Sequence, residues 1–232
     1  MKIPDLTSPE AIRKTVEDLG FLPFFRNGVE GFSIEELTSE ELWFSPLNDG
    51  PWEWKGPVIG GWNCAYGKFF AGKAGFVSLE WLPDFINWRR SVYPLEQQPD
   101  ETRHVLEVLR ENESLLSREL KKKSGYSLSR KRKKDLMGGV IDPNEKNGPA
   151  CDKIILNLEM ATYVCIADFE YNISREGERY GWGVARYCTP EAMYGVAITR
   201  CSRSPEESRS RIIAHMHALF PAADNRQWAK LI

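Results

Sequence analysis

Four acidic side chains are the candidates for chemistry on water. Glu53 and Glu80 each lie between apolar neighbours, where a carboxylate needs a partner because burial penalises its charge. Glu159 and Asp168 complete the set. A carboxylate of this kind can act as a general base, removing a proton from water as the water attacks a substrate. If the chain is an enzyme, we expect one of these four residues to activate water.

Tryptophan is concentrated in the amino-terminal half, which holds six of the eight residues of this type. In the segment from Pro51 to Gly56, strand-like alternation would place Trp52 and Trp54 on one face. Together with Trp81 they could form a pocket in which a flat ligand or a flipped base stacks. The alternative is an aromatic core, the commoner use of such side chains. We expect one of Trp52 and Trp54 to be core.

Basic residues cluster in the middle of the chain. Between Ser114 and Lys134 there are nine of them and a single acid, Glu119. Lys and Arg side chains neutralise phosphates and give salt-dependent affinity for nucleic acid, whereas a solvated loop would explain the same composition without function. The candidate DNA contacts, with two arginines further along, are Lys121, Lys122, Lys123, Arg130, Lys131, Arg132, Lys133, Lys134, Arg175 and Arg179.

Other catalytic patterns are missing from the sequence. The five cysteines are scattered without a Cys-x-x-Cys pair, and His215 and His217 are two residues apart, which places them on different faces of a helix. There is no phosphate-binding loop, dinucleotide-binding glycine pattern or nucleophile elbow. We therefore expect no metal and no cofactor.

The elements that would position the carboxy-terminal candidates follow the order of a winged helix. Apolar spacing predicts helices at residues 102–112 and 118–123, capped by Ser117, and a third helix at 152–161 capped by Asp152. The β-branched and aromatic segments Thr162–Tyr171 and Tyr180–Tyr187 then predict an antiparallel hairpin. Such an arrangement fits the DNA major groove.

The amino-terminal half predicts a leading helix and short strands. Ser8 caps a helix over Pro4–Leu19, and strands are expected at Gly56–Cys64, Ala65–Phe70 and Lys73–Leu79, before a helix at Pro83–Arg90. The polar segment 95–100 marks a boundary. The predicted fold is α+β, with a helix plus tryptophan-rich short-strand region at 1–98. It packs on a winged-helix region at 99–232 that contains a basic insertion at 125–150 and carboxy-terminal helices. No internal repeat is visible.

Charge is divided unevenly along the 232 residues. The first hundred carry nine Lys/Arg and fifteen Asp/Glu, whereas the rest carry 22 and 18, so the two parts differ in sign. No apolar run approaches the ~18–20 residues needed to span a bilayer, and the first residues lack the apolar core of a secretory signal. We expect a cytoplasmic protein with no membrane partner.

Several segments together resemble a known family. They are Trp43–Ile59 (WFSPLNDGPWEWKGPVI), Asn63–Arg90, Ser117–Lys122 and Thr162–Glu191. The chain is similar in these segments to the AlkZ-related family, winged-helix relatives of the AlkZ-type alkylpurine DNA glycosylases. The resemblance implies DNA as partner and base excision as activity. The glycosylases position water with a Gln-x-Gln motif. This chain has no Gln-x-Gln, and its nearest local pattern is Glu159-Met160-Ala161.

Two hypotheses about function follow from these observations. The first is a nucleic-acid-associated winged-helix protein that excises bases in the manner of a divergent DNA glycosylase. The second is a non-catalytic winged-helix module that binds a protein partner, or a small ligand in its tryptophan-rich half. A continuous positive groove would favour the first, and an acidic or patchy face would favour the second.

Overall fold

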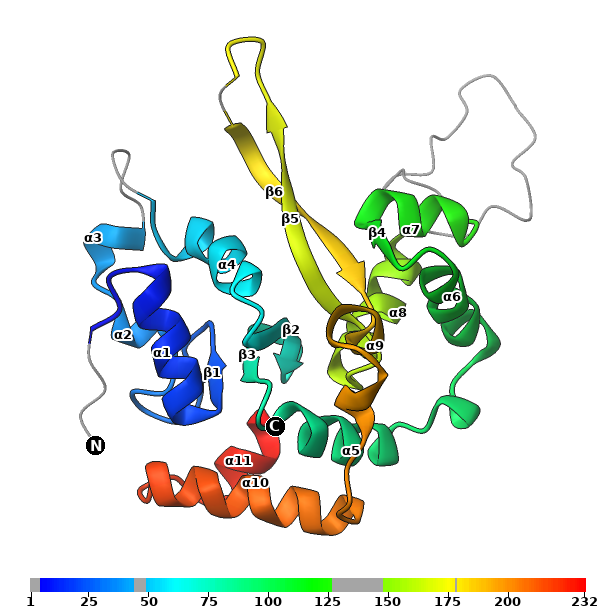
Figure 1. Ribbon diagram of the computed structural model, residues 1–232. Helices are drawn as coiled ribbons and strands as arrows, with labels where there is room; N and C mark the ends of the chain where they lie inside the picture. The colour runs from blue at the N-terminus through cyan, green and yellow to red at the C-terminus, as the bar shows by residue number, and fades with distance from the viewer. Residues whose placement is uncertain (1–4, 44–48, 127–147, 178) are drawn as a thin grey trace, which may run out of the picture.

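The computed structural model describes residues 5–43, 49–126, 148–177 and 179–232 (Figure 1). The fold mixes helices with two three-stranded antiparallel sheets in these ranges. The candidate segment Arg130–Lys134 lies outside the described residues.

An amino-terminal unit, residues 9–78, builds the first sheet. Its strands lie in the order β1–β3–β2. The elements in chain order are α1 (Pro9–Leu19), β1 (Phe21–Pro23), α2 (Ile34–Leu37), α3 (Glu40–Trp43), α4 (Pro51–Gly60), β2 (Cys64–Phe70) and β3 (Lys73–Ser78).

A carboxy-terminal unit, residues 100–188, builds the second sheet, with its strands in the order β4–β6–β5. Its elements are α6 (Asp100–Glu111), β4 (Ser114–Leu116), α7 (Ser117–Lys123), α8 (Gly148–Met160), β5 (Cys165–Ile173) and β6 (Arg179–Cys188). The remaining elements are α5 (Leu82–Val92) and η1 (Leu95–Gln97) between the units, and α9 (Pro190–Tyr194), η2 (Val196–Thr199), α10 (Pro205–Leu219) and α11 (Asn225–Leu231) after them.

The two units repeat one order of elements, apart from the added short helix α3. Each runs helix, strand, helices, hairpin, and in each the first strand pairs with the last. Left-handed residues also fall at the same junctions. Gly20 (φ 77°) and Glu113 (φ 57°) join the first helix to the first strand, and Trp62 (φ 59°) and Thr162 (φ 62°) follow the last helix. The structure thus contains a repeat that the sequence does not show.

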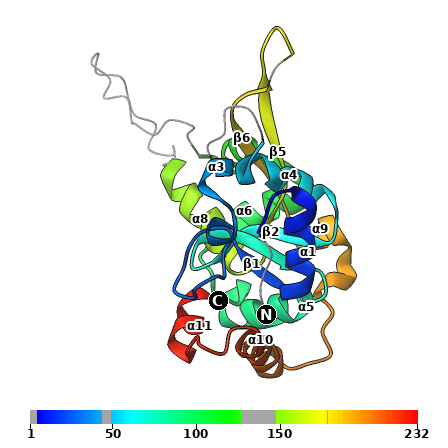
Figure 2. The same ribbon diagram turned by 90° about the vertical axis from the view of Figure 1, so that its left-hand side faces the viewer.

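The hairpin prediction for the carboxy-terminal unit is confirmed. β5 and β6 pair antiparallel, from Cys165 opposite Cys188 to Ile173 opposite Arg179. The base of β5 is buried, and its outer residues alternate between half-buried and exposed. Accordingly, the outer half of the hairpin projects from the body of the molecule in both views (Figures 1 and 2).

The strand predicted at Gly56–Cys64 is wrong, because residues 51–60 form the helix α4. Pro51 occupies its first turn, where no amide hydrogen is needed, and the side chain of Glu53 accepts the Gly50 amide at 3.0 Å. The buried residues of this helix have helical spacing; they are Pro51, Trp54, Lys55, Val58 and Ile59. The predicted caps also differ, since α7 is capped by Leu116 and α8 begins at Gly148.

The two units meet through corresponding elements. α8 of the second unit packs on β2 of the first, α4 of the first packs on β5 of the second, and β2 lies against β5. We call this contact region the seam.

The carboxy-terminal helix α10 packs along α5. There the buried Asp84 accepts a hydrogen bond from Ser208 (2.8 Å) and pairs with Arg203 and Arg211. The division of the chain at residue 98 stays a prediction.

We expect Gly20→Ala to destabilise the protein by about 1–3 kcal/mol, for two reasons. Gly20 has a φ of 77°, and a Cβ at this position would lie 2.5 Å from Cδ1 of the buried Trp81. Gly56→Ala is the matched control, because a Cβ meets nothing within 4 Å there and Ala favours the helix. Urea unfolding of both variants measures the effect. Equal stability of the two variants would contradict it.

Candidate functional site

Three of the four candidate carboxylates lie at the surface with local roles. Glu53 is exposed and completes the cap of α4. Glu80 is exposed and lies 3.5 Å from Arg211. Asp168, exposed on β5, accepts the amide of its neighbour Phe169 at 2.7 Å. These side chains have no enclosed environment that would tune them for catalysis.

Glu159 differs from the other three because it is fully buried at the carboxy-terminal end of α8, in the seam. Its Oε1 accepts the amide of Lys68, on β2, at 3.1 Å, whereas Oε2 has no hydrogen-bond donor in the described part of the chain. Burial raises the pKa of this carboxyl to about 7, although the charge and amide of Lys68 oppose the shift. The carboxyl of Glu159 is therefore easier to protonate than that of an exposed glutamate.

The seam also holds a buried lysine that the sequence did not single out. The Nζ of Lys55 lies 4.9 Å from the ring centroid of Trp52 and 4.2 Å from that of Phe169, which is on β5. Burial lowers its pKa, against the opposing charge of Glu53. Phe169 in turn packs against Tyr66 of β2, with ring centroids 5.9 Å apart. The sequence could have indicated this residue only if the segment had been predicted as a helix, because Lys55 then falls on the apolar face of α4.

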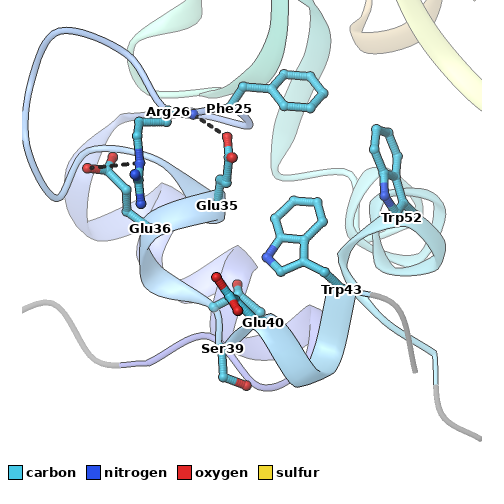
Figure 3. Close-up of a pocket in the computed structure, with 9 residues that line it drawn as sticks. Phe25, Arg26, Glu35, Glu36, Ser39, Glu40, Trp43 and Trp52 are labelled. Atoms are coloured by element: carbon cyan, nitrogen blue, oxygen red, sulfur yellow. Dashed lines mark hydrogen bonds and ion pairs between the residues drawn. The ribbon is translucent and has the colours of Figure 1, made fainter.

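An aromatic cavity of about 840 Å³ opens beside the seam (Figure 3). Trp52 lines it, but the expected acidic neighbours Glu53 and Glu80 do not. Trp54 is 6% exposed and belongs to the core. Among the described residues, the lining is formed by Phe25, Arg26, Glu35, Glu36, Thr38, Ser39, Glu40, Trp43 and Trp52.

Trp81 lies elsewhere and holds α10 in place. Its ring stacks on His215 with centroids 4.2 Å apart and an angle of 22° between the planes. The guanidinium of Arg211 covers the same indole at 3.7 Å. Trp81 is buried, and it is not among the described residues that line the cavity. The structure therefore does not bring it together with Trp52 at one pocket.

The described candidate cations are divided between α7 and the projecting hairpin. Lys122 and Lys123 are exposed in the last turn of α7, whereas Lys121 pairs with Asp152 at 2.6 Å. Arg175 is exposed near the hairpin turn, and the guanidinium of Arg179 lies 5.3 Å from the ring centroid of Tyr171. Lys122, Lys123 and Arg175 are thus exposed to solvent and available to an anion.

Within the residues that the structure describes, no group of three His, Cys, Asp or Glu side chains could hold a metal ion. In the same residues, no helix is both long and apolar enough to cross a membrane.

These features define a mixed α/β chain with a projecting hairpin and a fully buried carboxyl whose pKa is raised by burial. A protein-family model described as AlkZ related matches residues 6–232, nearly the whole chain. The chain therefore belongs to the AlkZ-related family, as its segments led us to expect. Comparisons with curated proteins and with solved structures found no match.

Proposed function

We propose that this protein binds duplex DNA through residues 100–188, which we assign as a winged helix. The observation that carries the proposal is the order α6–β4–α7–α8–β5–β6, with β4 paired to β6 and the β5–β6 hairpin projecting as a wing. In helix-turn-helix proteins a helix enters the major groove while neighbouring elements contact the backbone. Membership of the AlkZ-related family supports a role in DNA repair.

The charges favour recognition of backbone and shape over sequence. The exposed cations Lys122, Lys123 and Arg175 suit phosphate contacts, which position a protein without reading bases. On α8, Lys153 and Asn157 are exposed, but Ile155 and Leu158 are buried in the core. Few side chains of this helix can therefore read base edges. We infer binding directed by charge and shape.

For the chemistry, we propose base excision with Glu159 as general base. The ionised carboxyl would take a proton from water while the oxygen attacks the sugar carbon, and the base would leave with the electrons of the glycosidic bond. A pKa of about 7 is well matched to this task, and the other three candidates have surface roles. Because Glu159 is fully buried in this structure, the proposal requires α8 and β2 to part far enough to admit water and substrate, while the apolar surroundings that raise its pKa are kept.

The change Lys122→Ala plus Lys123→Ala should weaken binding to all duplex sequences alike. Each lost phosphate contact lowers the slope of log affinity against log salt by about one, so we expect a decrease of about two. Fluorescence anisotropy at several salt concentrations measures this slope. Arg226→Ala plus Lys230→Ala, exposed on α11 at the opposite end of the molecule from the hairpin, is the matched control (Figure 1). An unchanged slope in the α7 variant would rule out α7 as a phosphate-binding element.

A further inference from the structure

We infer that the aromatic cavity is a binding site for an alkylated ammonium group, carried by a small molecule or by a methylated lysine side chain. This site is separate from the proposed DNA contacts. Phe25, Trp43 and Trp52 surround a common space between α3 and α4, and Glu35 lies at its edge (Figure 3).

The walls of the cavity are aromatic faces set at steep angles. Trp43 and Trp52 meet at 81° with centroids 5.9 Å apart, and Phe25 and Trp52 meet at 56° with centroids 5.8 Å apart. Rings that meet at such angles present more than one ring face to the cavity, and the negative face of a ring attracts a cation. The ammonium of Lys55 lies 4.9 Å from the ring centroid of Trp52, so this indole already contacts one cation supplied by the chain itself.

The charge at the cavity also selects a cation. Three carboxylates line it against one guanidinium, that of Arg26. Glu35 accepts the Arg26 amide at 2.7 Å, and Glu36 accepts the Ser33 hydroxyl at 2.6 Å and lies 4.0 Å from Arg26. Glu40 is exposed and makes no hydrogen bond or ion pair with any described residue. The lining carboxylates therefore outnumber the lining cations, and Glu40 can attract a cation.

The aromatic walls favour an alkylated nitrogen over a primary ammonium. A primary ammonium is strongly hydrated and needs acceptors for its three N–H groups, whereas a trimethylammonium has no N–H to satisfy and presents methyl groups to the rings. A volume of about 840 Å³ is within the range of small-molecule sites and exceeds one such headgroup. The cavity therefore has room for a tail or a peptide backbone attached to the headgroup.

Calorimetric titration of the full chain with choline and with 3,3-dimethylbutan-1-ol, its neutral carbon isostere, tests the inference. We expect choline to bind roughly ten-fold more tightly than the isostere, the usual contribution of a cation at aromatic faces. A trimethyllysine peptide that binds more tightly than choline would identify a protein as the source, and the reverse order would identify a small molecule. Equal binding of choline and the isostere, or no binding of choline or peptide at millimolar concentration, would overturn the inference.

Two variants and one control locate the site. Glu40→Gln should weaken the binding of choline several-fold and leave the binding of the isostere unchanged. Glu96→Gln, which replaces an exposed acid on η1 outside the cavity, is the control and should change neither affinity. Trp43→Leu should abolish choline binding. Because Glu40 is exposed, its replacement tests the site even if the tryptophan variant unfolds. Choline affinity unchanged by Glu40→Gln would contradict the inference. DNA binding of the same variants should match wild type, which separates this result from the proposed function.

Discussion

Glu159→Gln should stabilise the folded protein above pH 7 by roughly 3 kcal/mol and leave its stability near pH 4 almost unchanged. The folded-state pKa of Glu159 is raised from 4.5 to about 7, chiefly by burial. Between these two values the folded protein binds more protons than the unfolded chain, so wild-type stability falls as the pH rises through this window. Above pH 7 the full cost of the buried charge is present. Glutamine carries no charge and avoids that cost.

Urea unfolding of wild type and variant at pH 4 and pH 8 measures the difference. Glu107→Gln, an exposed glutamate on α6, is the control and should show no pH-dependent gain. Loss of stability in Glu159→Gln at pH 8 would mean that the carboxylate has a partner in the folded protein, contrary to the unpaired Oε2.

The same variant connects stability with function. Active sites often retain groups that cost stability, because the perturbed pKa is what the chemistry uses. We expect Glu159→Gln to lose base excision, measured as release of a damaged base from duplex DNA, while its DNA affinity stays unchanged. A more stable variant with full excision would remove Glu159 from the mechanism.

Trp54→Ala should destabilise the protein by about 3–5 kcal/mol, the usual cost of deleting a buried aromatic side chain. Trp54 is 6% exposed on the inner face of α4, and its loss would leave a cavity where the helix meets the core. Trp52→Ala should cost less, because that ring is half-buried and already borders the cavity. A chain of this size loses about 2–4 °C of melting temperature per kcal/mol.

Thermal melts of the two variants side by side measure the order of the effects. We expect Trp54→Ala to melt well below Trp52→Ala, and Trp88→Ala, a second buried indole, to resemble the former. If Trp52→Ala were the less stable variant, Trp52 would contribute more than Trp54 to the packing of α4, which would contradict this prediction.

Local patterns in the sequence predicted most elements. The Ser8 cap, the spacing of α6 and the β5–β6 hairpin all depend on nearby residues, and all three are present. Gly56–Cys64 was predicted as a strand because it lies in a segment rich in aromatic residues, while the burial that marks residues 51–60 as a helix comes from tertiary contacts. The repeat was invisible because Gly20 corresponds to Glu113 and Trp62 to Thr162 at the shared junctions.

The candidate site was predictable only in part. Glu159 was one of four carboxylates that the sequence left unranked, because its isolation arises where α8 meets Lys68 of β2, 91 residues away in sequence. The ring of Phe169 that covers Lys55 comes from β5 in the other unit. Hydrophobic periodicity predicts which face of a helix or strand is buried, but it cannot show which other element packs on that face.

The measurement that tests DNA binding most directly is the affinity of the wild-type protein for an undamaged duplex at 50 and 200 mM salt. With about three phosphate contacts, one for each of Lys122, Lys123 and Arg175, the affinity should fall roughly forty-fold between the two concentrations, because bound counterions are released. Anisotropy of a labelled duplex gives both values. Affinity that does not change with salt, or no binding at 50 mM, would contradict the account.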